Sequence, residues 1–118
     1  MRNHKSLLAW QEANTVVRAV IIATRGRRHP CVDQLQRAAL SVQLNIAEGY
    51  ALRSSKRFRN HLDIAYASAV ETTELLELSR DLELLPADSL PSVIQRCMRC
   101  QALLLGLIKR LRKTQTPA

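Results

Sequence analysis

Aromatic residues and glycine are scarce in this chain of 118 residues, which has one Trp, two Tyr, one Phe and three Gly. Sheets draw on aromatic and β-branched residues for their strands and on glycine for their turns, so this composition favours helices. A chain of this length can bury one core without disulfides or metals. We therefore expect an all-α fold in a single domain spanning residues 1–118.

Long hydrophobic runs are also missing. The longest hydrophobic run considered for a membrane span, Ala102 to Ile108, is far shorter than the roughly 20 residues that cross a bilayer. The first residues lead into a segment interrupted by Gln11, Glu12 and Arg18, which does not fit a signal peptide. Three cysteines without an export signal indicate reduced thiols. We expect a cytoplasmic protein without membrane association.

Acidic residues are few relative to basic ones. The chain has 10 Asp and Glu against 18 Lys and Arg, which gives a formal net charge of +8. Such an excess favours an anionic partner, either nucleic acid or an acidic membrane surface.

Hydrophobic periodicity and the positions of proline predict four helices. Pro30 lies where the first turn of a helix tolerates proline, Gly49 is expected to end the second helix, and Pro86 to stop the third. The helices span about residues 6–24, 30–48, 55–85 and 90–113. Short connections between long helices favour an antiparallel up-down-up-down four-helix bundle.

Each predicted helix has an apolar inner stripe, which includes Ile21 on the first helix and Leu82 on the third. Further apolar residues lie off these stripes, and a lone bundle would expose them. They are Leu40, Leu44, Ile64, Leu103 and Leu107. We expect a homo-oligomer whose interface includes Leu40 and Leu44.

The second helix contains the most distinctive stretch of the sequence. Leu35, Ala39, Val42 and Ile46 recur at helical spacing, and a polar Asn45 borders this stripe. A polar side chain beside a buried stripe destabilises the fold unless it is hydrogen-bonded. On its own the stretch is typical of a core helix with a polar edge.

The segment from Arg37 to Gly49, RAALSVQLNIAEG, resembles the signature of four-helix-bundle proteins encoded in intervening sequences of bacterial 23S rRNA genes. Relatives include accessory proteins of diversity-generating retroelements. The resemblance implies the same bundle and a homo-oligomer, since several relatives are ring-shaped pentamers. Its structural signature comprises Trp10, Gln11, Arg37, Ser41, Asn45, Glu48, Gly49, Ser54, Phe58, Ser68 and Glu71.

The polar members of this signature are predicted to support the architecture. We expect Arg37, Ser41, Asn45, Glu48 and Glu71 to make hydrogen-bonded contacts between the second and third helices or across subunits. Loss of one partner of a buried charged pair typically costs about 3–5 kcal/mol.

Catalytic patterns are absent from the sequence. A carboxylate-bridged di-metal bundle needs Glu-x-x-His, and no Glu here has a His three residues later. Cys97 and Cys100 have C-x-x-C spacing, but only Cys31 and His29 could complete a zinc site. We expect no enzyme activity, metal or cofactor, and a structural role for a buried Cys97.

In the predicted topology, the chain start, the turn between helices two and three, and the chain end meet at one end of the bundle. We call this the basic end. It would collect Arg2, Lys5, Arg53, Lys56, Arg57, Arg59, Lys109, Arg110, Arg112 and Lys113. Only Glu12, Glu48 and Asp63 would lie near it, whereas charges at the opposite end nearly cancel.

Positive charge at the end of the fourth helix is favourable against the helix dipole, so a solvated charge run explains Lys109 to Lys113. Lys56 and Arg57 fall in the first turn of a helix, where each is disfavoured by roughly 0.3–1 kcal/mol. An anion bound there would account for them. We predict binding of nucleic-acid backbone, RNA before DNA, through Arg53, Arg59 and the other cations of this end. The alternative is an adaptor that docks a protein such as a reverse transcriptase.

Overall fold

The computed structural model describes residues 3–115, and their side chains up to Lys113. A short 3₁₀ turn, η1 (His4–Ser6), precedes four helices. These are α1 (Leu8–Thr24), α2 (Pro30–Ala51), α3 (Ser55–Asp81) and α4 (Leu90–Gln115). Within residues 3–115 there is no strand, so the predicted all-α fold is confirmed.

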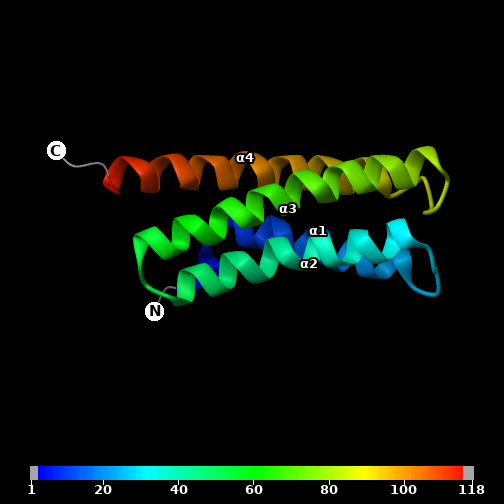
Figure 1. Cartoon of the computed structure of the whole chain (residues 1–118). Coiled ribbons are helices and arrows are strands. Elements are labelled where there is room, and N and C mark those ends of the chain that lie inside the picture. Colours follow the sequence, from blue (N-terminus) through cyan, green and yellow to red (C-terminus); the bar gives the residue numbers. More distant parts are fainter. Residues whose placement is uncertain (1–2, 116–118) are drawn as a thin grey trace.

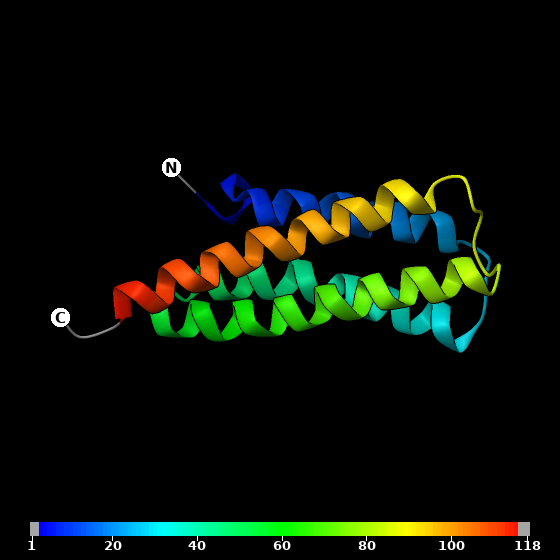
Figure 2. The ribbon, with the colours of Figure 1, turned by 90° about the horizontal axis from the view of Figure 1, so that it is seen from above.

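The helices form an elongated bundle of 51 × 26 × 22 Å in which consecutive helices run in opposite directions (Figures 1 and 2). α1 packs against α2 and α4, and α3 packs against the same two helices. α1 and α3 are therefore diagonal neighbours that run in parallel. The α2–α3 turn lies at the same end as the start of α1 and the end of α4, and we call the other end the loop end, residues 25–29 and 82–89.

The core lies between all four helices and combines large aliphatic with small side chains. Val20, Leu35, Leu76 and Leu104 are each exposed by 1% or less. Small buried residues let the helices approach one another closely. They are Ala9, Ala13, Ala38, Ala39, Ala65 and Ala69.

Gly49 does not end α2, contrary to the prediction. The helix continues to Ala51, and Arg53 adopts the left-handed conformation, with φ of 52°, that closes it. Gly49 instead allows α3 to approach, because a Cβ atom at this position would lie 2.6 Å from His61 Cβ. The sequence pattern identified an essential glycine but assigned it the wrong role.

α3 ends at Asp81, four residues before the predicted end at Leu85. Its last turn closes in a Schellman arrangement, since Leu84 N donates to Ser79 O and Glu83 N donates to Arg80 O. Glu83 takes the left-handed conformation, with φ of 55°, that glycine usually supplies. A non-glycine residue in that position left no signal in the sequence, so Pro86 was mistaken for the stop.

Some apolar side chains also differ from their predicted positions. Ile21 and Leu82, predicted to face inward, are 41% and 53% exposed. Leu103 and Leu107, predicted to lie off the inner stripe, pack against the core and are half-buried. Leu40, Leu44 and Ile64 are exposed, as the sequence pattern predicted.

Candidate nucleic-acid interface

The basic side chains predicted to cluster do belong to the same end of the bundle, where the α2–α3 turn, the start of α3 and the end of α4 lie (Figure 1). All but Arg59, which is half-buried, are exposed. The described members are Lys5, Arg53, Lys56, Arg57, Arg59, Lys109, Arg110, Arg112 and Lys113. Arg2 lies outside the described residues.

The start of α3 offers both cations and backbone donors. Ser54 is the N-cap: its Oγ accepts from Arg57 N at 3.4 Å, and its carbonyl oxygen accepts from Phe58 N at 2.8 Å. Within the described part of the chain, the amides of Ser55 and Lys56 have no acceptor. Amides at a helix start and neighbouring cations are together suited to a phosphate group.

Arg53 occupies an unusual backbone position next to this helix start. Its φ of 52° is a conformation that non-glycine residues adopt at a cost of about 1 kcal/mol or more. Its N–H donates to Tyr50 O, which closes α2, and its side chain is exposed. The turn therefore places an exposed arginine beside the first turn of α3.

Glu12 does not reduce the positive charge of the basic end. Its carboxylate, whose side chain is 12% exposed, pairs with Arg96 and Arg99 at 3.2 Å each. These two arginines lie on the middle of α4, so their charges hold Glu12 in the seam between α1 and α4. Of the carboxylates predicted near the basic end, Glu48 and Asp63 are exposed and have no ion pair within the described residues.

Aromatic rings near this end pack against one another. Tyr50 and Phe58 meet edge to face with centroids 5.7 Å apart, and His4 and Trp10 do so at 5.4 Å. All four side chains are half-buried. Gln11, another signature residue, donates from Nε2 to Lys5 O and so ties η1 to α1. Because the four aromatic rings pack in pairs and are half-buried, they stabilise the bundle and do not form an open platform on which bases could stack.

The polar signature residues form a chain of hydrogen bonds across the α2–α3 contact. The hydroxyls of Ser41 and Ser68 are 2.8 Å apart, and Asn45 Nδ2 donates to Ser41 O at 2.8 Å. Because the Asn45 amide nitrogen is committed, its Oδ1 accepts from His61 Nδ1 at 2.9 Å. His61 was missed in the sequence, where an isolated histidine carries no local signal.

The charged signature residues are less embedded than predicted. Glu71 is exposed, and its carboxylate accepts from Gln34 Nε2 at 2.7 Å, a neutral partner. Arg37 and Glu48 are exposed and make no hydrogen bond or ion pair within the described residues. Of the predicted interhelical contacts within one subunit, those of Ser41, Asn45 and Glu71 are present.

Two of the three cysteines, Cys97 and Cys100, lie in the core, whereas Cys31 is half-buried. Cys97 donates to Ala69 O and Cys100 to Ala9 O, and both thiols are buried. Burial raises the pKa of Cys97, and burial with the nearby Cys97 and Glu12 raises the pKa of Cys100 to about 12. Among the described residues, no group of three His, Cys, Asp or Glu side chains could hold a metal ion. Within the same residues, no helix has the length and hydropathy of a membrane span.

Comparison with known proteins identifies the family. The model of the 23S rRNA-intervening sequence proteins matches residues 5–106. A crystal structure of a protein of unknown function from the S23 ribosomal protein family of Bacteroides thetaiotaomicron shares the fold, with a TM-score of 0.77 and 22% identity, over 86% of this chain and 99% of that chain. No curated protein matches. Since the family match extends from η1 into α4, this chain belongs to the 23S rRNA-intervening sequence protein family.

Proposed function

We propose that this protein is a non-catalytic, oligomeric RNA-binding bundle that holds the phosphate backbone at its basic end. The observation that supports this most is the first turn of α3, where the exposed Lys56 and Arg57 oppose their own helix dipole beside two amides without acceptors. Cations at this position do not stabilise the helix, but they would stabilise a bound phosphate.

Recognition of the backbone, without readout of bases, follows from the chemistry of this end. Its exposed polar groups include many Lys and Arg side chains and free backbone amides, which are the usual partners of phosphate. The nearby rings of Tyr50 and Phe58 contact each other edge to face. The family takes its description from intervening sequences of 23S rRNA, and this genetic association makes RNA the first partner to test.

Assembly into a homo-oligomer is the second part of the proposal, with a pentamer as the size that the family resemblance implies. Leu40 and Leu44 on α2 are 38% and 52% exposed, and Ile64 on α3 is 51% exposed. Because Asn45 contacts His61, Leu44 and Ile64 lie near the same level of the bundle. An apolar patch on two adjacent helices is typical of a subunit interface.

A salt titration tests the binding. If each subunit neutralises about four phosphates, the slope of log affinity against log salt for single-stranded RNA should be near −3. Fluorescence anisotropy with labelled RNAs of different sequence should give similar affinities. Failure to bind any RNA, or an affinity indifferent to salt, would favour the alternative of a protein-docking adaptor.

A further inference from the structure

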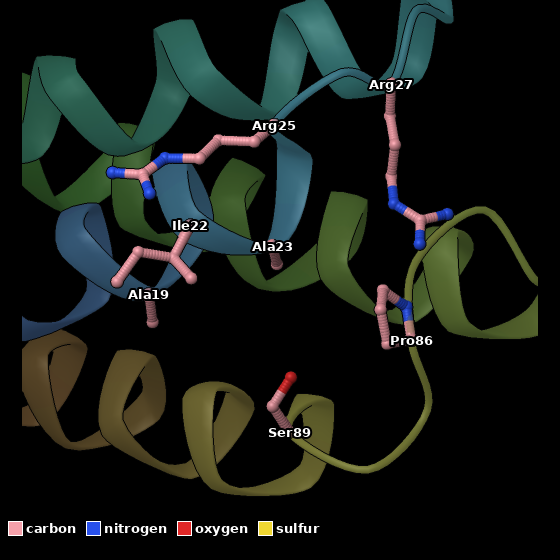
Figure 3. Close-up of a pocket in the computed structure, with 7 residues that line it drawn as sticks. All are labelled: Ala19, Ile22, Ala23, Arg25, Arg27, Pro86 and Ser89. Carbon is pink, nitrogen blue, oxygen red and sulfur yellow. The ribbon is translucent and has the colours of Figure 1, made fainter.

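The seam between α1 and α4 is open near the loop end. A depression of about 450 Å³ lies there, because α1 presents only the small Ala19 and Ala23 toward α4. Figure 3 shows Ile22 beside it, with Pro86 and Ser89 closing its far side. Ile22 is 63% exposed, more than any other large apolar side chain in the described part of the chain.

Two arginines flank this depression. Arg25 extends over α1 above Ile22, and Arg27 points toward Pro86 (Figure 3). Arg27 Nη1 donates to Leu84 O at 3.2 Å, which fixes the guanidinium at the rim. The lining residues include no carboxylate. The depression therefore suits an apolar group that is accompanied by negative charge.

A second depression, of about 150 Å³, lies on the same seam near the basic end. It is lined by Leu8, Leu103, Leu107 and Arg110, among others, and again by no carboxylate. Leu8 is 55% exposed. From Leu8 to Ile22 is two heptads of α1, about 21 Å at 1.5 Å per residue. Glu12 is the only carboxylate on α1 and α4, and it lies along α1 between Leu8 and Ile22. Its charge is already neutralised by Arg96 and Arg99.

The outer surface of α3 has the complementary pattern. Ile64 and Leu78 are 51% and 41% exposed and are also two heptads apart. Exposed carboxylates of Glu71 and Glu74 lie between them. Since α1 and α3 run in the same direction, Ile64 is the member nearer the basic end, as Leu8 is on α1.

We infer that the α1–α4 seam of one subunit receives the α3 surface of a second copy of this chain, with Ile64 near Leu8 and Leu78 near Ile22. This inference rests on the proposed assembly and specifies its contact. α1 and α3 lie on opposite corners of the bundle, so the contact joins two different surfaces. Such a head-to-tail contact closes into a ring or continues as a filament. Parallel subunits would gather their basic ends on the same side, which multiplies the charge presented to RNA.

Two surface variants test this contact. The seam variant carries Ile22→Asp and Arg25→Glu, and the α3 variant carries Glu74→Lys and Leu78→Lys; all four substituted side chains are exposed. Each variant should be a folded monomer by circular dichroism and light scattering. Mixed together, each supplies the intact surface that the other lacks, so the mixture should associate, at least as a 1:1 dimer, where each variant alone stays monomeric. Leu52→Asp, at a residue 43% exposed in the α2–α3 turn, should keep the wild-type size.

Retention of the wild-type size by either variant would overturn the inference, as would a mixture that stays monomeric. Loss of assembly with Leu52→Asp as well would show that added charge alone breaks the oligomer. The four substituted positions lie away from the turn that carries Arg53, Lys56 and Arg57. RNA binding by the monomeric variants therefore tests the proposed function separately, and its absence would not count against the contact.

Discussion

The α2–α3 pair and the α1–α4 pair differ in what holds them together and in what they expose. α2 and α3 meet through a close approach at Gly49 and through hydrogen bonds that involve Ser41, Asn45 and His61. α1 and α4 meet through apolar contacts, the bond from the Cys100 thiol to Ala9 O and the ion pairs of Glu12 with two arginines, and their surface is otherwise free of carboxylates. The carboxylates of α2 and α3 are Asp33, Glu48, Asp63, Glu71, Glu74, Glu77 and Asp81.

The residues that identify the family and the residues that we propose to bind RNA lie in different parts of the molecule. The stretch from Arg37 to Gly49 that marks the family belongs to α2, and its polar residues mostly bond within the bundle. The cations that we propose to bind RNA lie at the helix ends and the α2–α3 turn, outside that stretch. A family signature can thus report packing while the binding surface lies elsewhere.

The largest expected effect comes from adding a side chain at Gly49, where α2 and α3 approach each other closely. Gly49→Ala places a Cβ 2.6 Å from His61 Cβ, so α2 and α3 must separate, and we expect a loss of about 2–3 kcal/mol of unfolding free energy. Gly106→Ala on α4 is the matched control, because nothing lies within 4 Å of its added Cβ. It should gain up to about 1 kcal/mol from helix propensity. Equal effects in urea denaturation would contradict the close approach.

The hydrogen-bonded chain of the α2–α3 contact should contribute somewhat less. Asn45→Ala removes the acceptor of His61 Nδ1 and the donor to Ser41 O, and should cost about 1–3 kcal/mol. Gln34→Ala, which removes the exposed bond to Glu71, is the comparison within the same pair of helices and should cost far less. Thermal unfolding of both variants measures the difference in stability. A larger loss for Gln34→Ala than for Asn45→Ala would contradict the role given to the Asn45 hydrogen bonds.

The buried Cys100 thiol, which donates from α4 to Ala9 O of α1, predicts a dependence of stability on alkaline pH. The pKa of Cys100 is raised from 9.0 to about 12, so the unfolded chain ionises first as the pH rises. Below pH 9 this contribution to stability is fully present, and it is lost between about pH 9 and 12. Cys100→Ser should therefore flatten the decline of stability over that range. Identical pH profiles for the variant and the wild type would contradict the burial of this thiol.

Glu71 should have the smallest effect, although the sequence suggested a buried charged pair. Its carboxylate is exposed and bonded to the neutral Gln34, so Glu71→Gln should change the unfolding free energy of a subunit by no more than about 0.5 kcal/mol. A loss of several kcal/mol of unfolding free energy, measured by chemical denaturation at low protein concentration, would instead support the sequence-based prediction that Glu71 belongs to a buried charged pair.

The sequence was sufficient for the fold because helix periodicity and proline positions are local signals. Pro30 at the start of α2 was predicted, and it follows from local backbone chemistry because the first turn of a helix needs no N–H from that residue. The ends of α2 and α3 were missed because Arg53 and Glu83, two non-glycine residues, adopt left-handed conformations. Such positions depend on the tertiary structure and not on residue type alone.

The candidate site could be predicted only in part. Charge and topology indicated which cations share an end of the bundle, and the structure shows that Arg53 and Lys56 are exposed there. The partners of Glu12 and Asn45 could not be predicted, because Arg96, Arg99 and His61 reach them across helix contacts that leave no trace in local spacing. The depressions along the α1–α4 seam were missed for the same reason.

The salt dependence of RNA binding by a variant of the α3 start tests the central claim most directly. Replacing Lys56 and Arg57 by Gln should preserve or slightly increase stability, weaken binding for all RNA sequences alike, and flatten the slope by about one to two units. Replacing Arg25, Arg27 and Arg28 at the loop end, measured at a concentration where assembly is unchanged, should alter the slope much less. Equal losses from the two ends would contradict the account and show that the charge serves only solubility.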